Sequence, residues 1–147
     1  MAKFTTKVFA KVKNIPQPES AALLLAAVDV EFPAAALAVN DIIELAEIPA
    51  GVVLQDYDIH FPDIDSNGAP AFAFSVGVLN AGSTDLATVY AAGLTAGQSN
   101  AVVRAPNTDA AQASASAARR IGLKVTTAAA TYAGATKVGQ VVLALRG

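Results

Sequence analysis

The stretch from Asp41 to Phe61 places the strongest constraint on the fold, because its second half alternates between apolar and polar residues. One face of Val52–Phe61 carries Val53, Tyr57, Ile59 and Phe61, with Gln55 among them, and the other carries Val52, Leu54, Asp56, Asp58 and His60. A period of two with β-branched and aromatic residues is typical of a half-buried strand. Ile42–Ile48 is a second strand-like run, and Pro49 and Gly51 separate the two runs. We therefore predict a hairpin over this stretch.

Six further stretches have strand character, at Phe4–Val12, Leu23–Phe32, Ala71–Asn80, Ala101–Arg104, Ile121–Thr126 and Lys137–Leu145. The last two predict a second hairpin, connected by Ala128–Thr136. Leu86–Ala92 is predicted as a short helix, capped by Thr84 and ended by Gly93. About seven or eight strands with at most one or two short helices indicate an all-β antiparallel β-sandwich. The pattern leaves jelly-roll and immunoglobulin-like topologies open.

The length of 147 residues predicts one main domain. Pro16 and Pro18 interrupt the chain within Ile15–Ser20, where they favour extended backbone and forbid a helix. We therefore divide the chain into residues 1–19, a basic N-terminal arm with a proline linker, and residues 20–147, the β-sandwich domain. Residues 105–118 are mostly Ala, Ser, Gln and Asn, and we predict an irregular surface segment there.

Charge is segregated along the sequence although the net charge is only −2. The first 13 residues carry Lys3, Lys7, Lys11 and Lys13 and no acid, and residues 14–103 contain no Lys or Arg but eleven acidic residues. From Arg104 onward, six basic residues accompany one acid, Asp109. Such asymmetry indicates either pairing of the two ends with the middle inside one fold or charge-complementary contact between subunits.

The lysines of the arm have two interpretations. Phe4–Val12 is a strand with a basic face, which suits an arm that adds to a neighbour's sheet or to an acidic partner. The alternative is an edge strand whose lysines discourage unwanted pairing. Four lysines without arginine or aromatic residues for base stacking give little support for nucleic-acid binding, so we expect no nucleic-acid partner.

Asp56, Asp58 and His60 share one strand face at positions i, i+2 and i+4. Carboxylates and an imidazole so placed could hold a metal or perform acid–base chemistry. The alternative is the solvent-facing side of a strand, which is favoured because His60 is the only histidine and no nucleophile lies near it in sequence. We predict no catalytic residue and no bound metal or cofactor.

Residues 62–70 form a predicted loop that begins like a calcium-binding loop. Asp63, Asp65 and Asn67 stand at its first, third and fifth positions, and Gly68 stands at the sixth. The pattern requires a glutamate at the twelfth position, where this chain has Phe74. We therefore expect Asx-type turns, because Asp, Asn and Gly favour turns for local backbone reasons.

Composition excludes several classes of protein. The absence of Cys excludes disulfides, thiol nucleophiles and thiolate zinc sites. The longest apolar run, Ala21–Val28, is far shorter than the about 20 residues that a bilayer span needs, and the N-terminus does not resemble a secretory signal. Charged residues make up 15 % of the chain, against about 25 % in ordinary soluble domains. We expect no membrane association, synthesis in a cytoplasm, and a surface that is covered in an assembly.

Several segments together resemble a family of small tailed-bacteriophage virion proteins. They are DIIELAEIPAG, the acidic loop DIDSNGAP, FSVGVLN, the segment RRIGLKVTTAAAT and the last valine-rich strand, and the resemblance covers about Leu37–Gly147. The family consists of capsid decoration, or cement, proteins. The resemblance implies a jelly-roll-like β-sandwich and a homodimer or homotrimer. It also implies the major capsid protein as partner and a location on the outer surface of the capsid. It brings no catalytic residue.

The implied function is to bind the assembled capsid and stabilise it by bridging neighbouring subunits, with Lys3, Lys7, Lys11 and Lys13 against acidic capsid surface. A competing hypothesis is a carbohydrate-binding or fibre-associated module for adhesion at the virion surface. Three Tyr and no Trp argue against it, because sugar sites usually expose aromatic residues. An enzyme that uses Asp56, Asp58 and His60 is a third hypothesis, which predicts loss of activity on His60→Ala.

Overall fold

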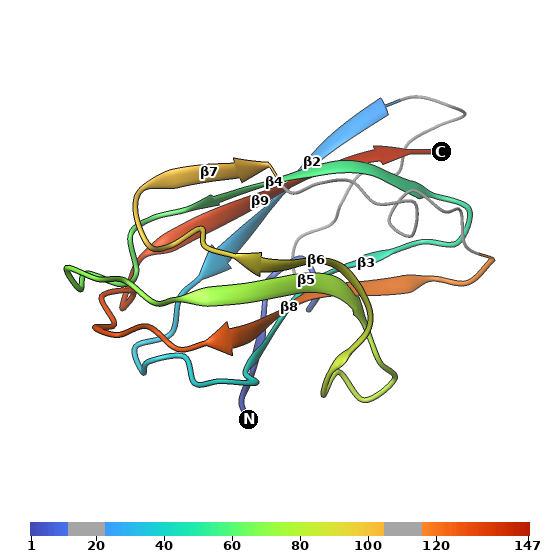
Figure 1. The fold of residues 1–147 in the computed structure, drawn as a ribbon. Coiled ribbons are helices and arrows are strands. Elements are labelled where there is room, and N and C mark those ends of the chain that lie inside the picture. Colours follow the sequence, from blue (N-terminus) through green and yellow to red (C-terminus); the bar gives the residue numbers. More distant parts are fainter. Residues whose placement is uncertain (12–22, 105–115) are drawn as a thin grey trace.

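The protein is all-β in a computed structural model that describes residues 1–11, 23–104 and 116–147 (Figure 1). It has nine strands and no helix in these residues: β1 (Lys3–Thr5), β2 (Leu23–Glu31), β3 (Ile42–Ile48), β4 (Val53–Phe61), β5 (Ala73–Leu79), β6 (Leu86–Leu94), β7 (Ala101–Arg104), β8 (Arg119–Thr127) and β9 (Val138–Arg146). The predicted division at residue 19 and the linker at residues 15–20 lie outside the described residues, as does most of the segment at 105–118.

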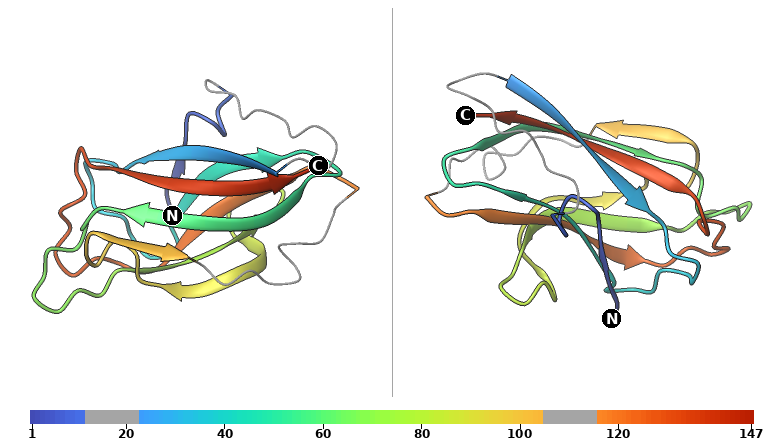
Figure 2. Two further views of the ribbon diagram at one scale, coloured as in Figure 1. Left: turned by 90° about the horizontal axis from the view of Figure 1, so that it is seen from above. Right: turned by 180° about the vertical axis from the view of Figure 1, so that it is seen from behind.

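The strands form two sheets packed face to face (Figures 1 and 2). The five-stranded sheet has the order β1-β3-β8-β5-β6, and the four-stranded sheet has the order β2-β9-β4-β7. Except for β5 and β6, consecutive strands from β2 to β9 lie in opposite sheets. Antiparallel pairs are nested, β5 with β6 innermost, then β4 with β7, β3 with β8, and β2 with β9 outermost. A long hairpin folded over in this way is a jelly roll, which confirms the predicted fold class.

The alternating residues of β4 follow the predicted faces over most of the strand. Tyr57, Ile59 and Phe61 are buried between the sheets, and the residues between them are partly exposed. Near its start, β4 shifts register against β9 between Leu54 and Asp56. A bulge moves subsequent side chains to the other face. Leu54 is therefore buried, although strict alternation places it with Asp56 on the outer face.

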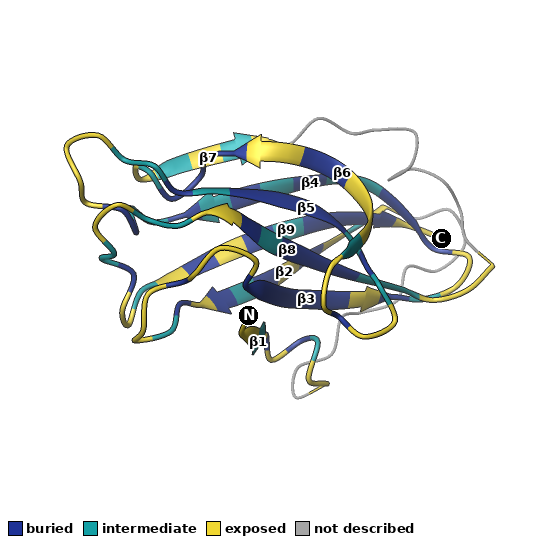
Figure 3. Cartoon of the chain, turned by 60° about the horizontal axis from the view of Figure 1, so that its bottom comes forward, coloured by how far each residue is buried: buried dark blue, intermediate teal, exposed yellow. Residues whose placement is uncertain are grey.

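The core lies between the two sheets and draws buried apolar residues from seven of the nine strands, with Phe4 of β1 and Val103 of β7 partly buried against it (Figure 3). Phe61 joins both sheets, because its ring lies 5.0 Å from that of Phe32 and 5.4 Å from that of Phe74, measured between centroids. The ring of Phe72 continues the cluster at 5.7 Å from Phe74. Edge-to-face and tilted contacts at these distances are favourable for aromatic rings.

Both predicted hairpins are wrong. β3 and β4 lie in opposite sheets, so the corner at Pro49–Gly51 carries the chain across the sandwich. β8 and β9 are likewise separated between the sheets. Alternation identifies a strand and its buried face, but it does not say which strand is its neighbour. A turn signal between two strands fits a crossing between sheets as well as a hairpin.

The predicted helix at Leu86–Ala92 is also wrong, because this segment is β6. Pairing with β5 places Tyr90 and Ala91 against the core, and tertiary contacts override local helix propensity. Gly77 in β5 permits the close approach of the two strands, since a Cβ atom there would lie 1.9 Å from the Thr88 carbonyl oxygen. β6 is the strand that raises the total above the predicted seven or eight.

The predicted strand at Phe4–Val12 is shortened to β1, which ends at Thr5. β1 pairs in parallel with β3, unlike the antiparallel pairs elsewhere among the described strands. The Thr6 hydroxyl donates to the Leu45 carbonyl and accepts from the Phe9 amide. The bond from Phe9 turns the chain, because a threonine side chain that bonds nearby backbone competes with the sheet ladder. Val8 is consequently buried against the core.

Candidate interaction surface

A groove opens on the outer face of the four-stranded sheet, and we call it the outer groove. Its apolar lining consists of Leu23 and Leu25 from β2 and Val142 and Ala144 from β9, and its polar lining includes Asp56, Asp58 and Arg104. The strand register explains this grouping, because Leu25 lies beside Ala144, which lies beside Asp56. The cavity volume is about 320 Å³. This is room for side chains of another molecule, not for a large ligand.

The polar side of the outer groove carries one ion pair and one further carboxylate. Arg104 of β7 donates to Asp56 of β4, and this contact raises the pKa of Arg104. Asp58 lies opposite Arg104 in the strand register. Its carboxylate makes no hydrogen bond with the described residues of the chain. The outer groove therefore presents a partly solvated acid next to exposed aliphatic side chains.

The structure places Asp56, Asp58 and His60 on this same outer face, as the alternation predicts. They do not form a metal site, because the described residues contain no group of three or more His, Asp or Glu side chains that could hold a metal ion. Asp56 is engaged by Arg104 and by the Tyr57 amide. The arrangement supports the solvent-facing interpretation of these residues.

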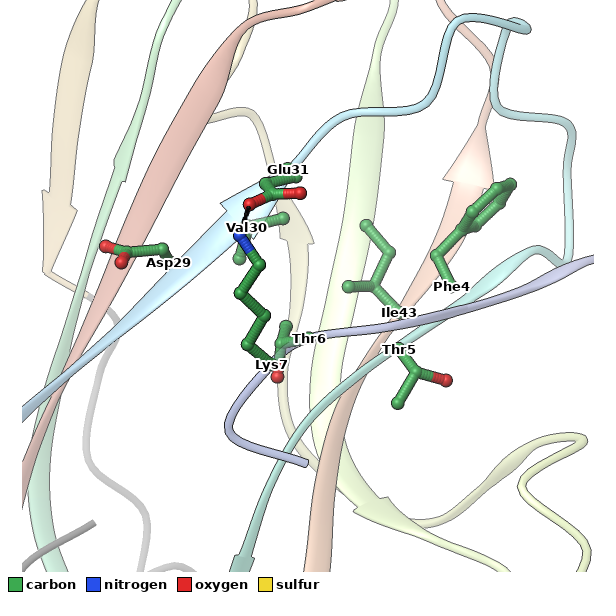
Figure 4. A pocket seen from close by; sticks show the side chains of 8 residues that line it. All are labelled: Phe4, Thr5, Thr6, Lys7, Asp29, Val30, Glu31 and Ile43. Atoms are coloured by element: carbon green, nitrogen blue, oxygen red, sulfur yellow. Dashed lines mark hydrogen bonds and ion pairs between the residues drawn. The ribbon is translucent and has the colours of Figure 1, made fainter. Parts of the chain in front are cut away.

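The N-terminal segment links the edges of both sheets, because β1 pairs with β3 and Lys7 reaches Glu31 of β2 (Figure 4). Lys3 donates to the Gly82 carbonyl at 2.6 Å. Lys7 pairs with Glu31 at the end of β2, and this contact raises the pKa of Lys7. A cavity of about 40 Å³ lies beneath this bridge. Lys11 is exposed, and Lys13 lies outside the described residues.

Charge segregation along the sequence results in pairing within the chain. Each of the three ion pairs in the described residues joins a basic residue near one end to an acid of the middle: Lys7 to Glu31, Arg104 to Asp56, and Lys124 to Asp85. Arg119, Arg120 and Lys137 donate to oxygen atoms of their own chain. Within the described residues, only Lys11 and Arg146 lack such a contact. Intramolecular pairing, one of the two predicted explanations, is confirmed.

The predicted calcium-like loop is organised around a buried carboxylate. Asp65 is 1 % exposed and accepts four backbone hydrogen bonds of 2.7–3.0 Å, from Ala71, Phe72, Ala130 and Thr131. Burial acts to raise the pKa of Asp65, but the four amide donors together lower it well below its ordinary value. The carboxylate thereby ties the loop after β4 to the loop after β8.

The remaining polar residues of this loop make the expected Asx turns. Asp63 accepts from the Asp65 amide, and Asn67 accepts from the Ala69 amide. Lys137 donates to the Asp63 carbonyl, and the Asn67 amide group donates to Thr131. The oxygen atoms that the motif would offer to calcium are instead used by the chain itself, which supports the Asx-turn interpretation.

Sequence reasoning missed the apolar side of the outer groove. Leu23 is 62 % exposed and Leu25 is 66 % exposed, although both belong to a strand that was correctly predicted. The signal was present, because the inward positions of β2 are Ala26, Val28 and Val30, which leaves Leu23 and Leu25 on the outer face. Arg104 was predicted at the end of a strand, but its ion pair with Asp56 was not.

No protein-family model matches the chain, and no curated protein matches it. A chain in a solved structure of the capsid of Ralstonia phage GP4 is 30 % identical, with a TM-score of 0.83 over 99 % of this chain and 97 % of that one. A chain in the capsid asymmetric unit of cyanophage Pam1 is 21 % identical, with a TM-score of 0.65 over 91 % of each chain. The second likeness supports the fold alone.

The jelly roll and the likeness to the GP4 capsid chain define a phage capsid-related structural protein of the virion. The chain belongs to the same family as the matched chain of the Ralstonia phage GP4 capsid. The predicted relation to phage virion proteins is confirmed at this level. Among the described residues, no helix is long and apolar enough to cross a membrane.

Proposed function

We propose that this chain is a decoration protein that binds the outer surface of a phage capsid and bridges neighbouring subunits of the major capsid protein. The observation that supports this most is the likeness over nearly the whole length to a chain of the GP4 capsid. A compact jelly roll whose charges are mostly paired internally suits a part that is added to a shell. The proposal includes assembly of the chain as a homodimer or homotrimer.

The mechanism is multivalent clamping. Each copy contacts more than one shell subunit, so weak individual contacts add up over the lattice. A protein that binds only the assembled shell stabilises it by mass action, in proportion to the logarithm of its free concentration over its Kd. The chain therefore shifts the equilibrium away from subunit loss and needs no chemical step.

The basic N-terminal segment contributes to this binding through Lys3, Lys7, Lys11 and Lys13, which meet acidic capsid surface. Lys11 is exposed and its side chain makes no hydrogen bond or ion pair with the described residues, so it is available for a partner. Lys3 and Lys7 must exchange Gly82 and Glu31 for capsid groups. Because exposed ion pairs are weak, this exchange has a low cost.

The proposal is tested with empty shells assembled from the capsid protein of the phage that encodes this chain. Adding the purified chain should raise the melting temperature of the shells, and an electron-microscopy map should show the chain on their outside. A map that places the chain within the shell wall would contradict the decoration role.

The contribution of the lysines is tested by charge reversal. Deleting residues 1–13 is unsuitable, because it also removes β1 and the buried Val8. Lys11→Glu with Lys13→Glu should weaken binding and flatten its salt dependence, since exposed charges are screened by salt. Unchanged binding would remove these two lysines from the interface.

Adhesion through carbohydrate receives no support from the aromatic residues. The described residues include all six Phe and three Tyr, and each of these side chains is buried or half-buried. A sugar-binding platform needs an exposed ring, so a glycan array is expected to show no binding.

A further inference from the structure

We propose that the outer groove docks a segment of the capsid shell that presents an apolar side chain next to a lysine or arginine. This inference rests on the proposed function and assigns to it a second contact surface, separate from the N-terminal lysines. The outer groove lies on the four-stranded sheet, formed by β2, β9, β4 and β7 (Figure 1).

The apolar half of the outer groove lacks a cover within the described residues. Leu23 and Leu25 are more than half exposed on β2, which is an edge strand and leaves the groove open along one side. Val142 of β9 forms the floor between them and β4. Adjacent aliphatic side chains at a concave site favour an apolar partner group, because its burial removes their surface from water.

The polar half specifies the charge of the partner. Arg104 engages Asp56, whereas the Asp58 carboxylate beside them has no hydrogen bond from the described residues. Arg104 is the basic side chain that lines the groove, and it lies opposite Asp58 and interacts electrostatically with both carboxylates, so one cation serves two acids. An acid at the edge of an apolar patch selects a partner cation and disfavours a partner anion.

A second copy of the chain is a poor source of the cation that the outer groove selects. Among its described residues, Lys11 and Arg146 are the basic side chains without a contact inside the chain. Arg146 stands beside Leu23 in the strand register, on the strand that already forms the groove floor. The other described lysines and arginines of a second copy would first have to leave contacts with their own chain, so we assign the matching cation to a different protein. Within the proposed function, that protein is the capsid shell.

The experiment measures binding of purified variants to empty shells assembled from the capsid protein alone. Leu25→Asp and Asp58→Lys each place an unfavourable charge in the outer groove, and each should weaken binding at least about tenfold, the effect of losing a well-packed contact. Val89→Asp is the matched control, because Val89 is 50 % exposed on β6 of the other sheet. It should bind like the wild type. Circular dichroism and melting curves confirm that each variant is folded.

Leu25→Ala is a second variant that removes the apolar contact without adding charge, and it should weaken binding less than Leu25→Asp. If Leu25→Asp and Asp58→Lys bind like the wild type, the docking role of the outer groove is wrong while the proposed function stands. If the wild-type chain does not bind the shells, both are wrong. If the groove variants lose self-association in sedimentation velocity, the occupant is a second copy and the assignment to the shell is overturned.

Discussion

Two carboxylates seven residues apart, Asp58 and Asp65, have opposite environments in this protein. Asp58 is on the outer face of β4 and accepts no hydrogen bond from the described residues, whereas Asp65 is buried in the next loop and accepts four. The sequence shows both as members of one acidic stretch. Backbone donors that converge from distant segments make Asp65 structural, and their absence at Asp58 leaves that carboxylate available for a partner.

The largest expected effect comes from Asp65→Asn. The substitution keeps the shape of the side chain but replaces one carboxylate oxygen by an NH₂ group. This NH₂ group would face backbone N–H donors in a buried site, where neither can accept a hydrogen bond. We expect a loss of about 3 kcal/mol in the free energy of unfolding, because a buried donor left unsatisfied costs about 1–3 kcal/mol and the lost acceptor was charged. Urea denaturation measures it.

Asp58→Asn is the matched control for this substitution. Its free energy of unfolding should equal that of the wild type, since surface substitutions away from specific contacts change stability by less than about 0.5 kcal/mol. Equal losses at the two positions would contradict the contrast between them.

The next effect is the acid sensitivity of the wild-type chain. The pKa of Asp65 is lowered from its ordinary 3.8, so its contribution to stability is fully present above that pH and is lost as the pH falls towards the folded pKa. The difference in stability between wild type and Asp65→Asn should therefore shrink between about pH 5 and about pH 2, which lie above and below the unfolded pKa. Denaturation midpoints over this range measure it.

Asp85→Asn serves as the control for acid sensitivity. The pKa of Asp85 is also lowered, first by its contact with Lys124, but this pair is exposed and screened by solvent. The difference in stability between wild type and Asp85→Asn should change little over the same pH range. A slope as steep as that of Asp65→Asn would mean that exposed pairs, not the buried carboxylate, set the acid limit.

Tyr57 tests the inward face of the strand that carries Asp58. Its hydroxyl is buried without a hydrogen-bond partner, and burial is the main cause that raises its pKa to about 12. Because the folded pKa exceeds the unfolded value of 10, stability is unaffected below that pH and declines as the pH rises towards 12. Tyr57→Phe should remove this alkaline step and change stability at neutral pH by at most about 1 kcal/mol, with stabilisation favoured. Absorbance titration of the tyrosines follows the ionisation that causes the alkaline step.

The smallest expected effect comes from Arg104→Gln. The guanidinium is on the surface, and exposed ion pairs contribute little to folding. We expect the melting temperature to stay within experimental error. A clear drop in the melting temperature would mean that the ion pair with Asp56 stabilises the pairing of β7 with β4. The outer groove would then contribute to folding stability as well.

The sequence predicted the strands well and their partners badly. Alternation and apolar runs located β2, β4, β5, β7 and β9 within a few residues, because burial of a strand's faces leaves a local pattern in the sequence. The pairing of β3 with β8 and of β4 with β9 depends on how the whole chain is rolled, and a corner such as Pro49–Gly51 carries no information about that. The predicted helix at Leu86–Ala92 was wrong because its neighbour β5 supplies the deciding contacts.

The site was predictable only in part for the same reason. Asx turns at Asp63 and Asn67 are local, and they were expected. The role of Asp65 was not, since two of its four donors, Ala130 and Thr131, lie more than sixty residues away. Predicting that Leu25 is exposed required knowledge of which face of β2 packs against the core.

The nested strand order also determines when the protein can fold during its synthesis. β9, which ends at Arg146, lies between β2 and β4, so neither of these earlier strands meets its main partner until that residue has been made. Loop closure between such distant segments is slow, and unpaired strands are prone to aggregate. The four-stranded sheet therefore completes only after β9 has emerged from the ribosome, and β2 and β4 stay without this partner until then.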